Sequence, residues 1–258
     1  RRERNLPELA WSLHQAHFPT STDALDRARE RLKYEELFLF EVALAVRRRK
    51  QGTAHKPHRI RIDAAVDARI RARLPFTLPG AQDGVVREIA HDLASPSPMN
   101  RLLQGDVGSG KTAVAVYALL ATVASGLQAA LLAPTEILAE QHRRTLDRYL
   151  AASRVRVGVI SGGGAPKARR DVRRRAATGE LDIAVGTHAL FTDTVRFARL
   201  GLVVVDEQHK FGVLQRKALR DKGFAPDLLV MSATPIPRTL TMTLYGDLDV
   251  SIVDELPP

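Results

Sequence analysis

Residues 105–112 combine glycines, a lysine and a hydroxyl side chain at a spacing that suits phosphate binding. They read Gly105-Asp-Val-Gly108-Ser109-Gly110-Lys111-Thr112 and match the pattern G-x-x-x-x-G-K-[ST] in full. Glycines let backbone N–H groups turn towards phosphate oxygens, and the start of a helix adds a partial positive charge. Lys111 would reach the β- and γ-phosphates, and the Thr112 hydroxyl would join the shell of a Mg²⁺ ion. An apolar strand precedes the segment and an apolar helix follows it, so the segment predicts a nucleotide-binding loop.

Two adjacent acids, Asp206 and Glu207, follow the apolar run 202–205. A carboxylate at the end of a buried strand can hold Mg²⁺, directly or through water, and this role falls to Asp206. Glu207 would orient and deprotonate the attacking water, and a second carboxylate beside the first favours hydrolysis over transfer to an acceptor. An acid pair that caps the next helix would explain one of the two carboxylates but not both. We therefore expect ATP and Mg²⁺ as cofactors, with Lys111, Asp206 and Glu207 in catalysis and Thr112 and Asp206 on the metal.

Short apolar runs alternate with helical patterns from about residue 82 onwards. The runs predict strands at 101–103, 129–133, 155–160, 183–185, 202–205 and 228–231, with helices at 112–125, 136–150 and 168–177. Near-continuous apolar strands between amphipathic helices indicate a parallel sheet that is covered on both faces. The expected fold class is therefore α/β, a doubly wound parallel sheet with its ligand site at the carboxyl ends of the strands.

The first 75 residues have a different character. Apolar residues spaced three and four apart predict one long helix over 23–51, and a second helical stretch follows at 64–74. The long helix suggests a connector between domains. Residues 1–75 carry a net charge of +7, out of +10 for all 258 residues. An excess of positive charge attracts polyanions, of which nucleic acid is the commonest in a cytosol. A helical face that is exposed to solvent explains the charge equally well.

Composition narrows the class of protein further. At 45% hydrophobic residues the chain can bury a core, which excludes wholesale disorder. It contains no cysteine, which excludes a disulfide scaffold, a thiol nucleophile and a thiolate metal site. The alanine-rich stretch 113–134 carries no charge, but Ser125, Gly126 and Gln128 divide it into two pieces of about half a membrane span each. We expect a cytoplasmic protein with no membrane contact.

The sequence around the two acids resembles a known family. Asp206-Glu207-Gln208-His209 is a DExH box, and the run 206–216 together with the glycine-rich loop resembles the RecG family of branched-DNA helicases in superfamily 2. Other runs are similar to helicase motifs in the expected order. Residues 76–82 resemble the Q motif, 133–141 motif Ia, 186–190 motif Ib and 232–240 motif III.

The resemblance implies a division of the chain and further site residues. It implies a helical connector over 1–75 and the first RecA-like P-loop domain over 76–258. Adenine would lie against Phe76 and Gln82, whose amide matches the N6/N7 edge of the base. The DNA backbone would contact Pro134, Thr135, Gly186, Thr187 and His188, for which ordinary helix capping is the alternative. Coupling of hydrolysis to DNA would involve Gln208, His209, Ser232, Ala233 and Thr234.

The implied function is that of the ATP-binding motor domain of an ATP-dependent DNA helicase or translocase. Such enzymes remodel branched DNA, meaning stalled replication forks and Holliday junctions, in recombination and repair. We expect branched DNA as a partner, together with a wedge domain and a second RecA-like domain of the same full-length chain, acting as a monomer. Two alternatives stay open: a related transcription-repair coupling or primosomal translocase, and a non-hydrolysing module that binds DNA or a protein.

Overall fold

The computed structural model describes residues 5–52, 55–163, 166–206, 225–233 and 248–255. The chain forms two compact units, one running to Lys50 and the other beginning at Gln51. In the described ranges, no helix has the length and apolar character needed to cross a bilayer.

In its described residues the first unit consists of two helices. Helix α2 (Thr22–Gly52) confirms the helix predicted over 23–51, whereas the sequence reading did not include α1 (Leu9–His17). Ser21 caps α2, since its Oγ accepts from the Ala24 N–H at 3.1 Å. The two helices pack through the early part of α2, where Ala28 is fully buried and the Arg31 side chain donates to the Pro7 carbonyl at 3.1 Å.

A seven-stranded sheet forms the centre of the second unit, with all its strands parallel and in the order β3-β4-β2-β5-β6-β1-β7. All six predicted strands are present, and among the residues that the structure describes β7, at the edge of the sheet, is the one strand that the sequence did not predict. The strands are β1 (Asn100–Gly105), β2 (Gln128–Leu132), β3 (Val157–Ile160), β4 (Ile183–Gly186), β5 (Leu200–Asp206), β6 (Asp227–Ser232) and β7 (Asp249–Val253).

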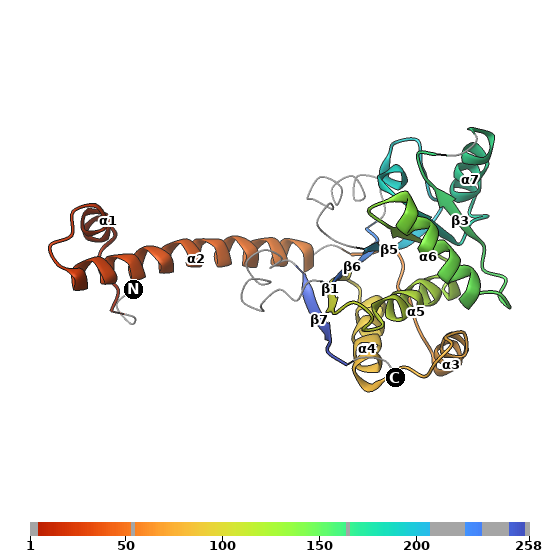
Figure 1. The fold of residues 1–258 in the computed structure, drawn as a ribbon, viewed down its shortest axis with the longest axis horizontal. Coiled ribbons are helices and arrows are strands. Elements are labelled where there is room, and N and C mark those ends of the chain that lie inside the picture. Colours follow the sequence, from red (N-terminus) through yellow and green to blue (C-terminus); the bar gives the residue numbers. More distant parts are fainter. Residues whose placement is uncertain (1–4, 53–54, 164–165, 207–224, 234–247, 256–258) are drawn as a thin grey trace. The chain divides into compact units, whose positions relative to one another are not determined.

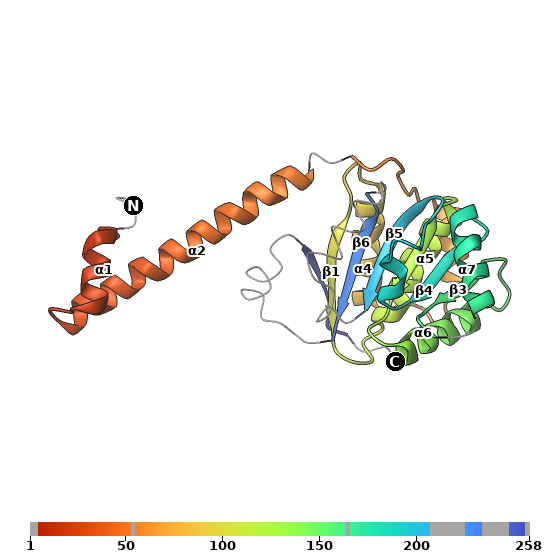
Figure 2. The same ribbon diagram turned by 90° about the horizontal axis from the view of Figure 1, so that it is seen from above.

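Helices cover both faces of this sheet. Figures 1 and 2 show α4 (Gly80–Ala94) and α5 (Lys111–Ala124) on one face and α7 (Pro166–Thr178) on the other. Helix α6 (Glu136–Tyr149) packs on β3 and β4. The path of the chain explains the two layers, because right-handed crossovers from β1 to β2 and from β2 to β3 run in one direction, and the crossover from β3 to β4 runs back. The doubly wound α/β prediction is confirmed.

Residues 55–74 pack with the α/β unit. The segment includes α3 (Ala64–Arg71), and Ile60, Ile70 and Leu74 belong to the same buried core as α4 and α5. The compact α/β unit thus begins well before residue 76.

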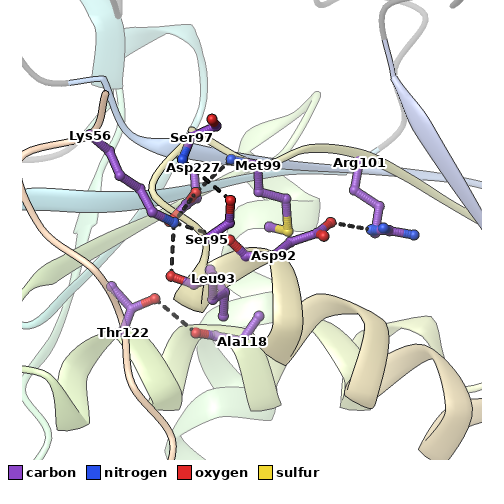
Figure 3. Close-up of polar contacts among 10 residues, drawn as sticks. All are labelled: Lys56, Asp92, Leu93, Ser95, Ser97, Met99, Arg101, Ala118, Thr122 and Asp227. Atoms are coloured by element: carbon purple, nitrogen blue, oxygen red, sulfur yellow. Dashed lines mark hydrogen bonds and ion pairs between the residues drawn. The ribbon is translucent and has the colours of Figure 1, made fainter. Parts of the chain in front are cut away.

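A buried ion pair fixes the start of this segment at the amino edge of the sheet (Figure 3). The Lys56 ammonium lies 2.9 Å from both carboxylate oxygens of Asp227, the first residue of β6, and these side chains are only 2% and 1% exposed. Lys56 also donates to the Leu93 carbonyl at 2.8 Å, and Asp227 accepts from the Met99 N–H at 2.7 Å. The pair therefore joins the segment before α3, the end of α4, the residue that precedes β1 and the first residue of β6.

Candidate nucleotide-binding site

The sheet brings the predicted phosphate and metal residues to one edge. In a parallel sheet all carboxyl ends lie on the same side, and β1, β6 and β5 are neighbours. Asp206 pairs with Met231 and Gln104 pairs with Ser232, so β5, β6 and β1 end at nearly the same level. The loop after Gly105, the Asp206 carboxylate and Ser232 therefore lie side by side at the centre of the edge.

The loop that joins β1 to α5 needs its glycines. Gly108 and Gly110 both have φ of +86°, in the left-handed region that disfavours other residues. At Gly105 a Cβ atom would lie 2.5 Å from the Ser109 Oγ and 2.8 Å from the Val253 carbonyl oxygen. A side chain at any of these three positions would therefore distort the loop.

The loop surrounds a cation and a buried hydroxyl. The Lys111 ammonium donates to the carbonyl oxygens of Gly105 and Asp106, each at 2.6 Å. Burial lowers the pKa of Lys111, and the charges of Asp206 and Asp106 offset only part of that effect. The Ser109 Oγ is buried and has no hydrogen-bond partner within the described part of the chain. A cation, an unused hydroxyl and the first N–H groups of α5 are donors that suit phosphate oxygens, so the loop fits the predicted nucleotide.

Gln82 contacts the loop directly. Its side chain is fully buried in α4, and its Nε2 donates to the Ser109 carbonyl at 2.8 Å and to the Glu255 carbonyl at 3.2 Å. The Oε1 is buried with no partner among the residues that the structure describes. In the structure Gln82 positions the phosphate loop, and its contact with adenine stays a prediction.

Phe76 borders a pocket on the segment between α3 and α4. This pocket has a volume of about 340 Å³ and is lined by residues 74–78 together with Arg71. The Arg71 guanidinium is held at 2.7 Å from both Asp67 and Asp83. An aromatic side chain and a guanidinium that is held in place can both contact a planar base, so the pocket is compatible with the predicted role of Phe76.

Asp206 has a partner that the sequence reading missed. The Nε2 of His142, in the middle of α6, lies 2.5 Å from the Asp206 Oδ2, and the two side chains are 11% and 20% exposed. His142 and Thr112 line the same small cavity between α5 and α6. Thr112 and the histidine that bonds to Asp206 thus border one cavity, and a hydroxyl and a carboxylate are the oxygen ligands that Mg²⁺ prefers.

The residues predicted for DNA contact meet on two neighbouring strands. Pro134 and Thr135 follow β2, while Gly186 ends β4 and Thr187 and His188 come next; Leu132 pairs with Gly186. Thr135 caps α6 by accepting from the Leu138 N–H at 3.3 Å, as the capping alternative requires. Thr187 stands at the corresponding position before a short 3₁₀ helix (His188–Phe191), but its side chain makes no capping hydrogen bond. Capping thus explains Thr135 but does not explain Thr187.

Several predicted residues cannot be placed. Glu207, Gln208, His209 and Thr234 lie outside the described residues. Ser232 is buried at the end of β6, and Ala233, the next residue, is half-buried. Because Asp206 pairs with Met231, both residues lie close to the end of β5.

Comparison with known proteins decides the family. Residues 82–243, well over half of the chain, match the DEAD/DEAH box helicase family. The chain belongs to this family. The matched range includes both the glycine-rich loop at 105–112 and the two acids at 206–207.

Within the helicases the chain is similar to RecG proteins along its whole length. It is 48% identical to the ATP-dependent DNA helicase RecG of Synechocystis, with 100% of this chain and 31% of that protein aligned. It is also 48% identical to the Bacillus subtilis RecG, over 100% of this chain and 38% of that protein. A structure of RecG bound to a three-way DNA junction matches with a TM-score of 0.85 and 41% identity, over 100% of this chain and 34% of that one. The RecG resemblance seen in the motifs is confirmed, and the chain spans about a third of the length of these relatives.

Proposed function

We propose that this chain is the ATP-binding motor domain of an ATP-dependent DNA helicase that remodels branched DNA, as at stalled forks and Holliday junctions. The observation that carries the proposal is the complete phosphate loop near Asp206, in a chain whose whole length aligns with part of RecG. The full-length protein would work as a monomer in the cytoplasm, with a wedge domain and a second RecA-like domain joined to this one.

The residues of the edge would divide the chemistry between them. Lys111 and the loop N–H groups would bind the phosphates, and the pocket beside Phe76 would take the adenine base. Thr112 and Asp206 would hold Mg²⁺, which when bound offsets the negative charge of the phosphates during an in-line displacement. Glu207, next to Asp206, would orient the attacking water and accept its proton.

DNA would bind at the β2 and β4 end of the same edge. Thr135, Thr187 and the N–H groups that open α6 would contact phosphates of one strand, which positions the DNA without reading its sequence. Asp206 ends β5, the neighbour of β2, so the DNA residues and the nucleotide residues lie on adjacent strands. A displacement of residues at one site would therefore need to pass only between adjacent strands to affect the other site.

Hydrolysis in the full-length protein tests this function. We expect ATP turnover that a three-way junction stimulates more strongly than a linear duplex of the same length and base composition. Equal stimulation by the two DNAs would contradict the branched-DNA assignment, and the absence of turnover with either would favour a non-hydrolysing module.

A protein made of residues 1–258 alone provides a contrasting case. We expect it to bind nucleotide but to hydrolyse almost none, because an arginine from a second motor domain contributes roughly 10³–10⁵ in rate in comparable enzymes. Robust turnover by this protein would mean that it contains its own catalytic arginine, and Arg238 would be the first residue to replace. Arg238 lies outside the described residues.

Helix α7 allows a test of the electrostatic part of DNA binding. Lys167 and Arg170 are exposed on α7, whereas Arg174 on the same helix is already paired with Asp171 and Glu180. If α7 contacts DNA, replacing Lys167 and Arg170 with glutamine should make the negative slope of log K against log salt shallower by about 0.7–0.9 for each lost phosphate contact. Arg174→Gln serves as the matched control and should change the slope less. Identical slopes in all variants, measured by fluorescence anisotropy, would remove α7 from the DNA site.

A further inference from the structure

His142 occupies a position in α6 where an apolar residue would be expected. The buried residues of this helix are Ala139, His142 and Leu146, which follow the three- and four-residue spacing of a core-facing stripe. A polar side chain in such a stripe costs stability unless it forms a hydrogen bond. The imidazole forms one, and its partner is the carboxylate of Asp206 on β5 rather than a backbone group.

This contact restricts Asp206. A carboxylate has two oxygens, and His142 engages Oδ2, so the side chain is held in one orientation and Oδ1 is left for another partner. Residues that hydrogen-bond to a metal ligand commonly set the direction in which that ligand presents its oxygen. His142 stands in this relation to Asp206.

The helix that carries His142 begins at the proposed DNA site. Thr135 caps α6, and the next residue, Glu136, accepts from the Gly163 N–H at 3.0 Å, which fixes the start of the helix against the turn after β3. His142 lies seven residues beyond Thr135, two helical turns or about 10 Å along the axis. A helix of this length moves as a rigid body, so a displacement at Thr135 also displaces the imidazole.

We propose that His142 is a positioning residue that holds Asp206 for Mg²⁺ and connects that carboxylate, through α6, to the DNA contact at Thr135. The proposal rests on the proposed function, because it requires both Mg·nucleotide and DNA to bind at this edge. It adds to the proposed function a residue, His142, and a helix, α6, that connect the nucleotide site with the DNA site.

Three substitutions separate this role from simple packing. In His142→Gln the amide nitrogen reaches about as far as the imidazole Nε2 and can still donate to Asp206. In His142→Asn the same amide is too short, and in His142→Leu the space is filled without a donor. Asp147→Asn, on the exposed face of α6, is the control.

The first readout is the Mg²⁺ dependence of ADP binding, which is measured by calorimetry. We expect the Asn and Leu variants to need about 10–100-fold more Mg²⁺ for half-maximal binding, the usual effect of losing a partner of a metal ligand. The Gln variant should stay near wild type, and ADP binding without Mg²⁺ should be the same in all. The Gln and Asn pair decides the result even if the Leu variant is unstable, since both are amides of similar polarity.

The second readout is the coupling between DNA and nucleotide in the full-length protein. We expect a three-way junction to change the Mg·ADP affinity by a factor that moves towards one in His142→Asn and is retained in His142→Gln. Because such coupling is reciprocal, the effect of Mg·ADP on junction affinity should change by the same factor.

The possible failures differ from one another. If wild-type protein binds no Mg·ADP, the proposed function fails and the role of His142 fails with it. If wild type binds Mg·ADP but the Gln, Asn and Leu variants share its Mg²⁺ dependence, His142 does not position Asp206. If only the coupling factor is unaltered in the Asn variant, the connection through α6 is wrong.

Discussion

Replacing Glu207 with glutamine should stop most ATP hydrolysis in the full-length protein while leaving Mg·ATP binding almost unchanged. We expect turnover to fall at least about 10²-fold, the usual scale for the loss of a general base. The reason is that Glu207 follows Asp206, the last residue of β5, in the sequence, and only β6 separates β5 from β1, the strand that leads into the phosphate loop. Glutamine keeps the size and polarity of the side chain but cannot accept the proton from water.

The Asp206→Asn variant is compared with Glu207→Gln to separate the roles of the two acids. It should weaken Mg²⁺-dependent nucleotide binding as well as hydrolysis, because Asp206 is the expected metal ligand. Single-turnover hydrolysis and equilibrium binding with a fluorescent ATP analogue separate the two effects. Normal turnover by Glu207→Gln would mean that another group activates the water.

The buried Lys56–Asp227 pair predicts the largest change in stability. We expect Lys56→Met to lower the free energy of unfolding of the α/β unit by about 3–5 kcal/mol, because the Asp227 carboxylate is then buried without its cation. Lys56→Met/Asp227→Asn should recover much of this loss, since the amide is neutral and can still accept from the Met99 N–H. Lys167→Met, at an exposed position on α7, should stay within about 0.5 kcal/mol of wild type.

The pH dependence of these variants tests the charge directly. Burial raises the pKa of Asp227 to about 6 from the ordinary 3.8, although Lys56 opposes the shift. Since the folded state holds this proton more tightly, the stabilising contribution of Asp227 is complete below about pH 4 and is lost as the pH rises through 6. Without Lys56 the pKa rises further, so the deficit of Lys56→Met relative to the double variant should grow between pH 5 and 8.

Circular dichroism combined with hydrogen exchange in β1 and β6 is the appropriate measurement. The single tryptophan, Trp11, lies in the other unit, so intrinsic fluorescence would not follow this transition. A loss below about 1 kcal/mol in Lys56→Met, comparable to an exposed substitution, would show that the pair contributes little.

The sequence predicted most of the fold because the patterns that mark its strands, its helices and the phosphate loop each lie within a short segment. The apolar runs of β1 to β6 are short and separated by helical patterns, and the loop at 105–112 is a contiguous motif. Strand β7 was missed because it alternates at an exposed edge, with Asp249 and Ile252 exposed and Ser251 and Val253 buried. Its weak pattern lacks the continuous apolar run that marked the inner strands.

The missed contacts join residues that are far apart in the chain. Lys56 and Asp227 are separated by 171 positions, and Lys56 stands in a polar stretch without an apolar pattern that would mark it as buried. His142 and Asp206 are 64 positions apart, so no local pattern connects the two side chains. The spacing of His142 with Ala139 and Leu146 is the one signal that could have identified it as buried.

Calorimetric titration of the 258-residue chain with Mg·ADP tests the central claim most directly. The geometry of Lys111 inside the glycine loop predicts saturable one-to-one binding by wild type and an affinity about 10–100-fold lower in Lys111→Ala, the cost of losing a hydrogen bond to a charged group. Lys167→Ala, on exposed α7, should bind as wild type does. Equal affinity in wild type and Lys111→Ala, or no binding by wild type, would contradict the assignment of residues 105–112 as the nucleotide site.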